Sequence, residues 1–207
     1  MKKTYFYLGL ICLFIPISCT KDEVNQENVL EYLPLKVGNY WIYQTYLCDS
    51  VSENCNDYVI DTVTVIKDTT INGNKYFKLK GTYYKQDLMD YLRDSGHYIV
   101  NIKGDIIFSN KTFNKTLNHY VLETDKGDTI YYADYQMKKA GDPVNITLGE
   151  FDCLNYQGEL YAKTDNFITP RYTNNYYSKN VGLIYSTSFY LIKGDQIKRE
   201  LIGYHLE

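Results

Sequence analysis

The sequence lacks the motifs that most catalytic and metal sites need. Its three histidines, His97, His119 and His205, lie far apart and form none of the paired spacings that bind zinc. No serine occupies a Gly-x-Ser-x-Gly elbow, and no glycine-rich phosphate loop follows a strand-like segment. The sequence therefore predicts a protein without a metal or other cofactor, and one that is not an enzyme.

Positive charge is also scarce. The 207 residues include 22 lysines and arginines against 25 aspartates and glutamates, a formal net charge of −3. Nucleic acids and anionic lipid surfaces attract basic faces, so neither is expected as a partner. With 44% hydrophobic and 23% charged residues, the composition is typical of one folded domain rather than a disordered chain.

The apolar run near the N-terminus is too short to span a bilayer stably. It covers Tyr5–Ile15, follows two lysines, and precedes the small residue Ser18 and then Cys19. This order is typical of a secretory signal, and it predicts that residues 1–18 are cleaved just before Cys19. The Cys19 thiol would then carry a lipid that holds the mature chain at a membrane surface. Cleavage also removes both lysines, which makes the net charge −5.

Two short motifs around Cys19 resemble those of bacterial lipoproteins. Ile15–Cys19 is similar to a lipobox, with Pro16 where leucine is usual. Thr20–Glu23 resembles the export tag of Bacteroidota surface lipoproteins, a lysine followed by two acids. The resemblance implies a lipid-anchored outer-membrane protein that faces the cell exterior, with a periplasm-facing anchor as the alternative. Residues 19–31 are polar and aperiodic, which predicts a flexible tether between the lipid and the domain.

The remaining cysteines have distinct expected roles. Cys48 and Cys55 flank a short polar loop, and in an oxidising envelope compartment they are natural disulfide partners. Cys153 lies in a strand-like segment, so a buried, inert thiol is expected there rather than a nucleophile.

Most of the chain has the pattern of β-strands. In Lys75–Tyr83 apolar residues alternate with lysine and threonine, as in a strand with one buried face. The preceding Asn72-Gly73 pair is a type I′ hairpin signal. The tripeptide Lys-Gly-Asp occurs three times, at residues 103–105, 126–128 and 193–195. A type I turn followed by a bulge explains the glycine in each case.

Helical signals are nearly absent. Lys85–Asp94 also fits a short helical turn, but its continuation into a glycine favours a hairpin arm. Long loops are expected at Asn110–Asn118 and at Thr164–Asn175, where Pro170 excludes a central strand. We therefore predict a single all-β domain, residues 32–207, built as an antiparallel meander curled into a barrel-like or half-barrel sheet.

Four segments, in order along the chain, resemble a group of Bacteroidota outer-membrane lipoproteins that have no assigned function. They are Tyr32–Tyr43, with the pattern Y-x-P-L-K-V-G-N-x-W-x-Y, and Asp68–Phe77, Gly149–Cys153 and Tyr176–Ile184. The resemblance implies an envelope location and a strand-rich architecture. It brings no catalytic residues with it.

Tyrosine is the abundant residue of this chain, with 24 copies. Its flat ring and single hydroxyl suit the pleated surface of a sheet, and the same ring stacks on sugar faces. One tyrosine- and asparagine-rich segment is a candidate carbohydrate-binding lip, formed by Arg171, Tyr172, Asn174, Asn175, Tyr176 and Tyr177. Because tyrosines occur in many strands rather than in one cluster, packing within the sheet is favoured over a ligand platform.

Three functional hypotheses follow from the sequence. The first is a non-enzymatic binding module for a glycan or a surface protein, held by its lipid at the envelope. The alternative is a carrier whose curled sheet encloses an apolar cavity for a lipid or acyl chain. The third is a hydrolase that uses two carboxylates brought together from different strands.

Overall fold

The structure is a computed structural model that describes residues 28–49, 54–162, 170–189 and 195–207. The predicted signal, the lipidation site Cys19 and residues 20–27 of the tether lie outside the described residues. The first element, the 3-10 helix η1 (Val29–Glu31), begins inside the predicted tether, and its Val29 is fully buried. Val29 thus packs against the domain although it lies in the segment predicted as tether. Among the described residues, no helix is long and apolar enough to cross a membrane.

In the described part of the chain, fourteen strands follow η1. They are β1 (Tyr40–Cys48), β2 (Cys55–Ile71), β3 (Asn74–Tyr83), β4 (Gln86–Ser95), β5 (Tyr98–Asn101), β6 (Ile106–Ser109), β7 (Thr116–Glu123), β8 (Thr129–Lys139), β9 (Val144–Ile146), β10 (Gly149–Phe151), β11 (Cys153–Ala162), β12 (Arg171–Ser178), β13 (Gly182–Phe189) and β14 (Gln196–His205). Twelve of them form one antiparallel sheet in the order β6-β5-β4-β3-β2-β1-β14-β13-β12-β11-β8-β7, and β9 and β10 form a separate hairpin.

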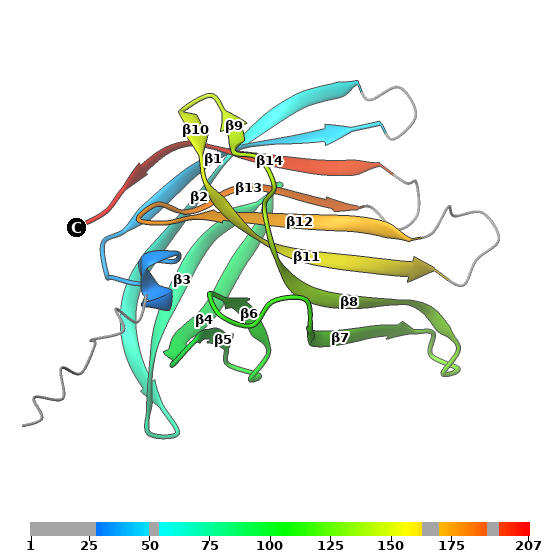
Figure 1. The fold of residues 1–207 in the computed structure, drawn as a ribbon, viewed down its shortest axis with the longest axis horizontal. Coiled ribbons are helices and arrows are strands. Elements are labelled where there is room, and N and C mark those ends of the chain that lie inside the picture. The colour runs from blue at the N-terminus through cyan, green and yellow to red at the C-terminus, as the bar shows by residue number, and fades with distance from the viewer. Residues whose placement is uncertain (1–27, 50–53, 163–169, 190–194) are drawn as a thin grey trace, which may run out of the picture.

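The sheet curls into an incomplete barrel, which confirms the predicted fold class. At one end, on the left of Figure 1, β3 to β6 lie opposite the C-terminal strands and close the barrel. At the other end, on the right, β2, β1, β14, β13, β12, β11, β8 and β7 continue alone. This second part is a half-barrel, and we call its hollow side the trough. Its two outermost strands in Figure 1 are β2 and β7.

Local turn chemistry matches the sequence at most hairpins. Asn72 and Gly73 both have positive φ between β2 and β3, as a type I′ turn requires. At residues 101–105 and 124–128 the same two backbone hydrogen bonds close a turn that has a positive-φ glycine in its fourth position. Lys-Gly-Asp therefore makes a bulged turn twice. Part of the third copy lies outside the described residues.

The two predicted long loops are shorter than expected. β7 already begins at Thr116, and β12 begins at Arg171, directly after Pro170. Pro170 predicted that this segment is not a central strand, but Pro170 lies just before the first residue of β12 and takes no place in its ladder. β12 therefore pairs with β11 on one side and β13 on the other. Lys85–Asp94 forms most of β4, as predicted.

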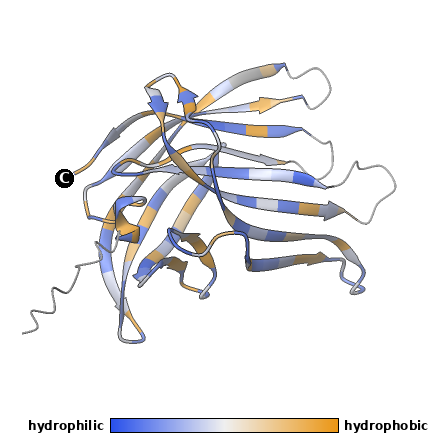
Figure 2. Ribbon diagram, viewed as in Figure 1, coloured by the Kyte–Doolittle hydropathy of each residue, from blue (hydrophilic) through white to orange (hydrophobic). Residues whose placement is uncertain are grey.

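The hydrophobic core fills the closed end. Along the strands, apolar and polar residues alternate, as Figure 2 shows by colour. Trp41, Phe108, Met137, Ile184 and Leu201 are all at most 2% exposed and belong to one cluster. Strands such as β1 and β14 therefore bury the face that turns into the barrel and leave the other face more exposed.

A side chain closes the seam where the two ends of the sheet meet. The backbone N–H of Ile106 in β6 donates to Oδ1 of Asn118 in β7 at 3.2 Å, and Asn118 Nδ2 donates back to the Ile106 carbonyl. The Tyr156 hydroxyl donates to the same carbonyl at 2.6 Å. The amide of Asn118 thus replaces the pair of backbone hydrogen bonds that a neighbouring strand would make.

The three cysteines of the described residues have the predicted states. Cys48 and Cys55 form a disulfide that joins β1 to β2 at the open end. Cys153 is a free, buried thiol whose Sγ donates to the Phe151 carbonyl. Burial raises the pKa of Cys153 to about 12, so the thiol is neutral and inert at physiological pH.

Candidate functional site

The structure does not bring the six residues of the predicted lip together on one surface. Successive residues of β12 point to opposite faces of the sheet. Tyr177 lies in the core, with its ring centroid 4.9 Å from that of Phe108. Tyr176 is half-buried beside Tyr185, with ring centroids 6.1 Å apart. These two tyrosines pack within the fold.

The two asparagines of the lip hold β12 to its neighbour β11. Oδ1 of Asn174 accepts from Asn155 at 2.8 Å and from Gln157 at 3.0 Å. Nδ2 of Asn175 donates to the Tyr156 carbonyl at 3.1 Å. Their amides are therefore structural.

The open end of β12 carries the other two lip residues. The guanidinium carbon of Arg171 lies 5.5 Å from the centre of the Phe189 ring. Tyr172 is 44% exposed, and its hydroxyl donates to Glu159 at 3.3 Å. Tyr172 is thus the most exposed aromatic residue of the predicted lip.

Tyr172 belongs to a row of rings on the sheet that the sequence did not reveal. Tyr161 also donates to Glu159, at 2.6 Å, and it stacks on Tyr132 with ring centroids 4.9 Å apart. His119 adjoins Tyr132 at 5.8 Å and hydrogen-bonds Asp134 at 2.8 Å. We call Tyr172, Tyr161, Tyr132 and His119 the aromatic row. Tyr161 and Tyr132 stack on each other, which leaves less face of these two rings for a ligand.

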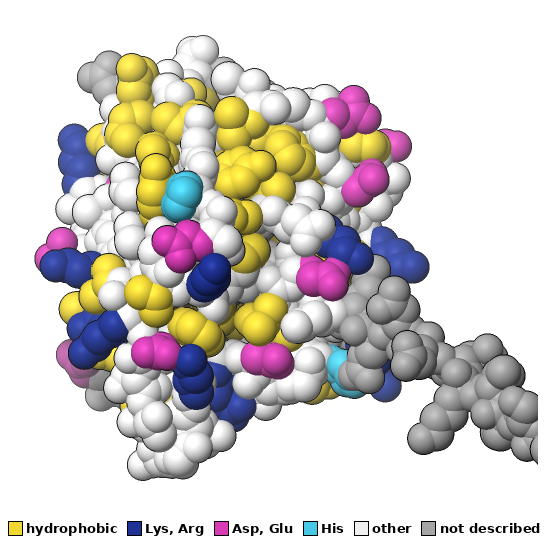
Figure 3. All heavy atoms as spheres, turned by 90° about the vertical axis from the view of Figure 1, so that its left-hand side faces the viewer, with side chains coloured by type: hydrophobic (Ala, Val, Ile, Leu, Met, Phe, Trp, Pro, Cys, Tyr) yellow, Lys and Arg dark blue, Asp and Glu magenta, His cyan; other side chains and the backbone are white. Residues whose placement is uncertain are grey.

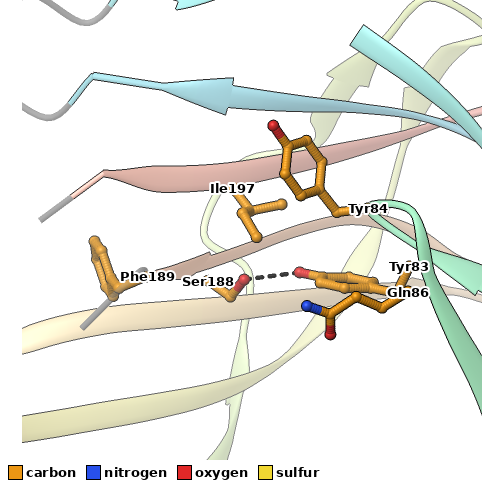
Figure 4. Close-up of a pocket in the computed structure, with 6 residues that line it drawn as sticks. All are labelled: Tyr83, Tyr84, Gln86, Ser188, Phe189 and Ile197. Atoms are coloured by element: carbon orange, nitrogen blue, oxygen red, sulfur yellow. Dashed lines mark hydrogen bonds between the residues drawn. The ribbon is translucent and has the colours of Figure 1, made fainter. Parts of the chain in front are cut away.

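A better-formed site lies where the β3–β4 hairpin meets β13 and β14. A pocket of about 240 Å³ opens there, lined by Tyr83, Tyr84, Gln86, Ser188, Phe189 and Ile197. Figure 4 shows the Tyr83 hydroxyl and Ser188 pointing toward each other, and their oxygens are 2.7 Å apart. Tyr84 and Phe189 lie toward the two sides of the pocket in this view. The walls thus combine aromatic rings with an amide and hydroxyls.

An inward bend of β3 places Tyr83 and Tyr84 in this pocket. β3 pairs with β2 only as far as Gly81, opposite Val63. A Cβ on Gly81 would stand 1.9 Å from the Thr62 carbonyl oxygen, so only glycine allows the backbone of β3 to come this close to β2. Beyond it, the chain turns at Tyr84 and Lys85, both with positive φ. Non-glycine residues in that conformation are strained, and such strain clusters at functional sites.

A buried arginine holds the hairpin in place behind the pocket. Arg199 of β14 is 4% exposed, and its guanidinium carbon lies 3.8 Å from the Tyr43 ring centre and 5.1 Å from that of Tyr83. Its Nη2 donates to the Thr82 carbonyl at 3.2 Å. A cation between two rings is stabilised by both when water is excluded.

Asp61 of β2 supports the same hairpin from the opposite side. Its Oδ2 accepts from the Thr45 hydroxyl at 2.6 Å and from the Tyr84 backbone N–H at 2.9 Å. Burial by itself would raise the pKa of Asp61. The hydrogen bonds and the positive charge of Arg199 outweigh it, so the pKa lies below its ordinary value. Asp61 is therefore ionised at neutral pH and stabilises the turn.

The hydrolase hypothesis named no residues, and Asp90 and Asp105 are two acids whose charges influence each other in the structure. Burial raises the pKa of Asp90 above its ordinary value of 3.8, and the negative charge of Asp105 raises it further. Burial also raises the pKa of Tyr120 to about 12, with a contribution from its hydrogen bond to Asp105. Neither acid lines the pocket described above. The described residues contain no group of three or more histidine, cysteine or acidic side chains able to hold a metal.

We predict that Asp90→Asn stabilises the protein at neutral pH. Because the pKa of Asp90 is higher in the folded state than in the unfolded state, its contribution to the free energy of unfolding is fully present below the unfolded pKa. It is lost as pH rises through the folded pKa. The asparagine removes this loss, so its unfolding midpoint in urea should exceed wild type at pH 7 and match it near pH 3. Asp87→Asn, at an exposed position of the same strand, is the control and should gain nothing; an equal gain there would contradict the prediction.

The interior does not favour the carrier hypothesis. At the closed end, the space inside the barrel is occupied by packed side chains such as Trp41 and Met137. At the open end, the inward-facing groups include Asp61 and Arg199, a buried carboxylate and a buried cation. An acyl chain would have to displace the packed side chains at the closed end or lie against the buried charges at the open end, and contact with apolar groups costs free energy for a buried charge.

Two solved structures resemble this fold at low sequence identity. One is a protein from Bacteroides fragilis described as exported and as having a YmcC-like fold. It has a TM-score of 0.44 and 14% identity, and the match covers 83% of this chain and 97% of that one. The other is described as a lipoprotein from Parabacteroides distasonis, with a TM-score of 0.46, 12% identity, and coverage of 84% and 98%. No family model matches the sequence, and no curated protein matches it.

Sequence reasoning missed the pocket residues. Tyr83 appeared only as the end of an alternating strand, and the pattern of residues 75–83 gave no reason to single out Tyr84, Ser188 or Phe189. One local signal was present. Tyr84 and Lys85 form the two-residue turn between β3 and β4 with positive φ, a conformation in which type I′ turns normally have glycine or asparagine.

Proposed function

We propose that this chain is an outer-membrane lipoprotein that binds a carbohydrate in the pocket beside the β3–β4 hairpin. The chemistry of the pocket wall is the observation that supports the proposal. Tyr84 and Phe189 offer rings for the apolar C–H faces of a sugar, and Gln86 and Ser188 offer hydrogen bonds for its hydroxyls. The volume of about 240 Å³ is below that of a site for a drug-sized ligand, which suits a single sugar unit of a longer chain.

The placement of the chain start supports the same proposal. η1, where the tether reaches the domain, lies at the closed end in Figure 1, and the strands of the half-barrel extend to the opposite end. Figure 3 views the closed end, where hydrophobic side chains gather in the upper half of the face. A lipid on Cys19 would hold this end nearer the membrane. The pocket would then face the medium, with the outer face of the outer membrane as the proposed location.

Calorimetry and thermal unfolding with a panel of oligosaccharides test the proposal on the mature chain carrying Cys19→Ser. A ligand at 100 times its Kd adds about 2.7 kcal/mol, which raises Tm by roughly 5–10 °C for a chain of this size. We expect Tyr84→Ala to abolish the shift, because it removes a pocket ring and keeps the backbone N–H that Asp61 binds.

Tyr172→Ala in the aromatic row is the matched control, and it should leave binding unchanged. Loss of binding in Tyr172→Ala but not in Tyr84→Ala would move the site to the aromatic row. Fatty acids that raise Tm when no oligosaccharide does would overturn the proposal in favour of the carrier.

A further inference from the structure

β2 leaves part of one edge without a partner strand. It pairs with β1 from Cys55 to Thr64, but with β3 only from Val63 onward. Because β3 turns inward at Gly81, no described strand lies beside residues 55–62 on that side. In Figure 1 this part of β2 forms the upper margin of the trough.

The backbone groups on this edge can be assigned from the ladder. The N–H of Val65 donates to the Asn39 carbonyl at 2.9 Å, on the β1 side. Antiparallel pairs alternate along a strand, so the odd-numbered residues of β2 bond toward β1. The N–H and C=O groups of Tyr58 and Ile60 therefore point to the open edge. Their side chains are 57% and 53% exposed, and neither carries a charge.

The β6 margin of the sheet is guarded, because β6 has only four residues and the Asn118 amide occupies its Ile106. The β7 margin is guarded in part: it carries His119, bonded to Asp134, and ends at Glu123, while Tyr120, Val121 and Leu122 between them are uncharged and 38–46% exposed. Exposed edges in monomeric proteins usually carry such protection, because an unguarded edge pairs with another strand. Tyr58 and Ile60 have none.

We propose that this edge pairs with the same edge of a second copy of the chain. A two-fold axis at Val59 would place Tyr58 of each copy opposite Ile60 of the other. Tyr58 and Ile60 are the residues whose backbone groups point outward, so each pair would exchange two backbone hydrogen bonds. An aromatic ring opposite a β-branched side chain is also a favourable cross-strand pair. The backbone groups of residues 58–60 are thus complementary to those of a second copy, which a symmetric dimer requires.

The neighbouring strands hold this edge in an extended conformation that suits such pairing. On its other side β2 is bound to β1, and β1 to β14, so the strand is not free to fold away. The disulfide between Cys48 and Cys55 fixes the end of the β1–β2 ribbon. Pairing would continue the sheet across the axis without changing either half-barrel.

Sedimentation of the mature chain with Cys19→Ser over a range of concentrations tests the proposal. We expect a monomer–dimer equilibrium. Ile60→Lys, which places a charge on the edge, should raise its Kd at least about tenfold. Met89→Lys is the matched control, because Met89 is 59% exposed on another strand, and it should leave the Kd unchanged. Circular dichroism of both variants should match wild type.

A cysteine at the axis tests the register. In the proposed dimer the two Val59 residues form a non-hydrogen-bonded pair with Cα atoms about 4.5 Å apart, within disulfide range. Val59→Cys should therefore crosslink two copies on oxidation, and Met89→Cys should not. A monomer at every concentration would overturn the proposal. A dimer whose Kd is unchanged by Ile60→Lys would also overturn it. Species larger than a dimer would overturn it as well, because they indicate pairing between unlike edges.

Discussion

Gly81→Ala should destabilise the protein by about 3 kcal/mol or more, even though it adds a single methyl group. That methyl would meet the Thr62 carbonyl oxygen at 1.9 Å and the Val63 Cα at 2.8 Å. Both are backbone atoms of a paired strand, so neither can rotate away, and relief requires a shift of β2 or β3. Overpacking of this kind usually costs 1–3 kcal/mol and more where the surroundings are rigid. Urea unfolding followed by circular dichroism measures the loss.

Gly203→Ala is the matched control for that experiment. Gly203 is also a strand glycine, but the atoms nearest to its added Cβ belong to the Ile42 side chain, at 3.8 and 4.0 Å. This is ordinary contact, so the substitution should be neutral or slightly stabilising through the unfolded state. If both substitutions lowered the free energy of unfolding equally, the close approach of β3 to β2 at Gly81 would not be the cause. Because this close approach also brings Tyr83 and Tyr84 to the pocket, Gly81→Ala should weaken the binding of any ligand there.

Trp41→Ala should cost about 3–5 kcal/mol, the usual range for a buried aromatic ring. Trp41 is the single tryptophan of the chain, is 2% exposed, and donates from Nε1 to the Val181 carbonyl at 2.6 Å. Its ring also lies against Gly182, where an added Cβ would approach Nε1 to 2.9 Å. The ring therefore joins β1 to the turn before β13 by packing and by a hydrogen bond.

Trp41→Phe separates these two contributions. It keeps most of the apolar ring but leaves the buried Val181 carbonyl without its donor, for which a cost of about 1–3 kcal/mol is expected. Circular dichroism must follow both variants, since the fluorescent residue is gone. If Trp41→Phe proved as unstable as Trp41→Ala, the hydrogen bond would carry the effect, and the packing argument would fail.

Much of the fold was predictable because its signals are local. The alternation in residues 75–83 predicted a strand, and β3 spans these residues, with Leu79 buried and Lys80 exposed. The Asn72-Gly73 turn follows from the positive φ that a two-residue hairpin needs. The disulfide between Cys48 and Cys55 followed from their short separation. Each of these depends on residues within a few positions of one another, so the sequence alone is sufficient.

The candidate site was not predictable in the same way. The lip at Arg171–Tyr177 was inferred from a cluster along the chain, but a strand turns alternate residues to opposite faces, so Tyr172 and Tyr177 end in different environments. The pocket combines β3, β4, β13 and β14, and it depends on the bend that Gly81 permits. The contacts of Arg199 with Tyr43 and Tyr83 likewise join three segments that are distant in the sequence, so no local pattern predicts them.

The Asn118 seam has a consequence for how such a fold can change over time. A barrel closed by a continuous ladder must keep strand number and shear in step, so adding or deleting a hairpin breaks its closure. Here closure depends on one amide that reaches Ile106, and no ladder crosses the gap between β6 and β7 in the described residues. A hairpin gained or lost at either margin would leave the register of the other strands intact. The circumference of this sheet is therefore free to vary between related chains while its centre, β2-β1-β14-β13, stays the same.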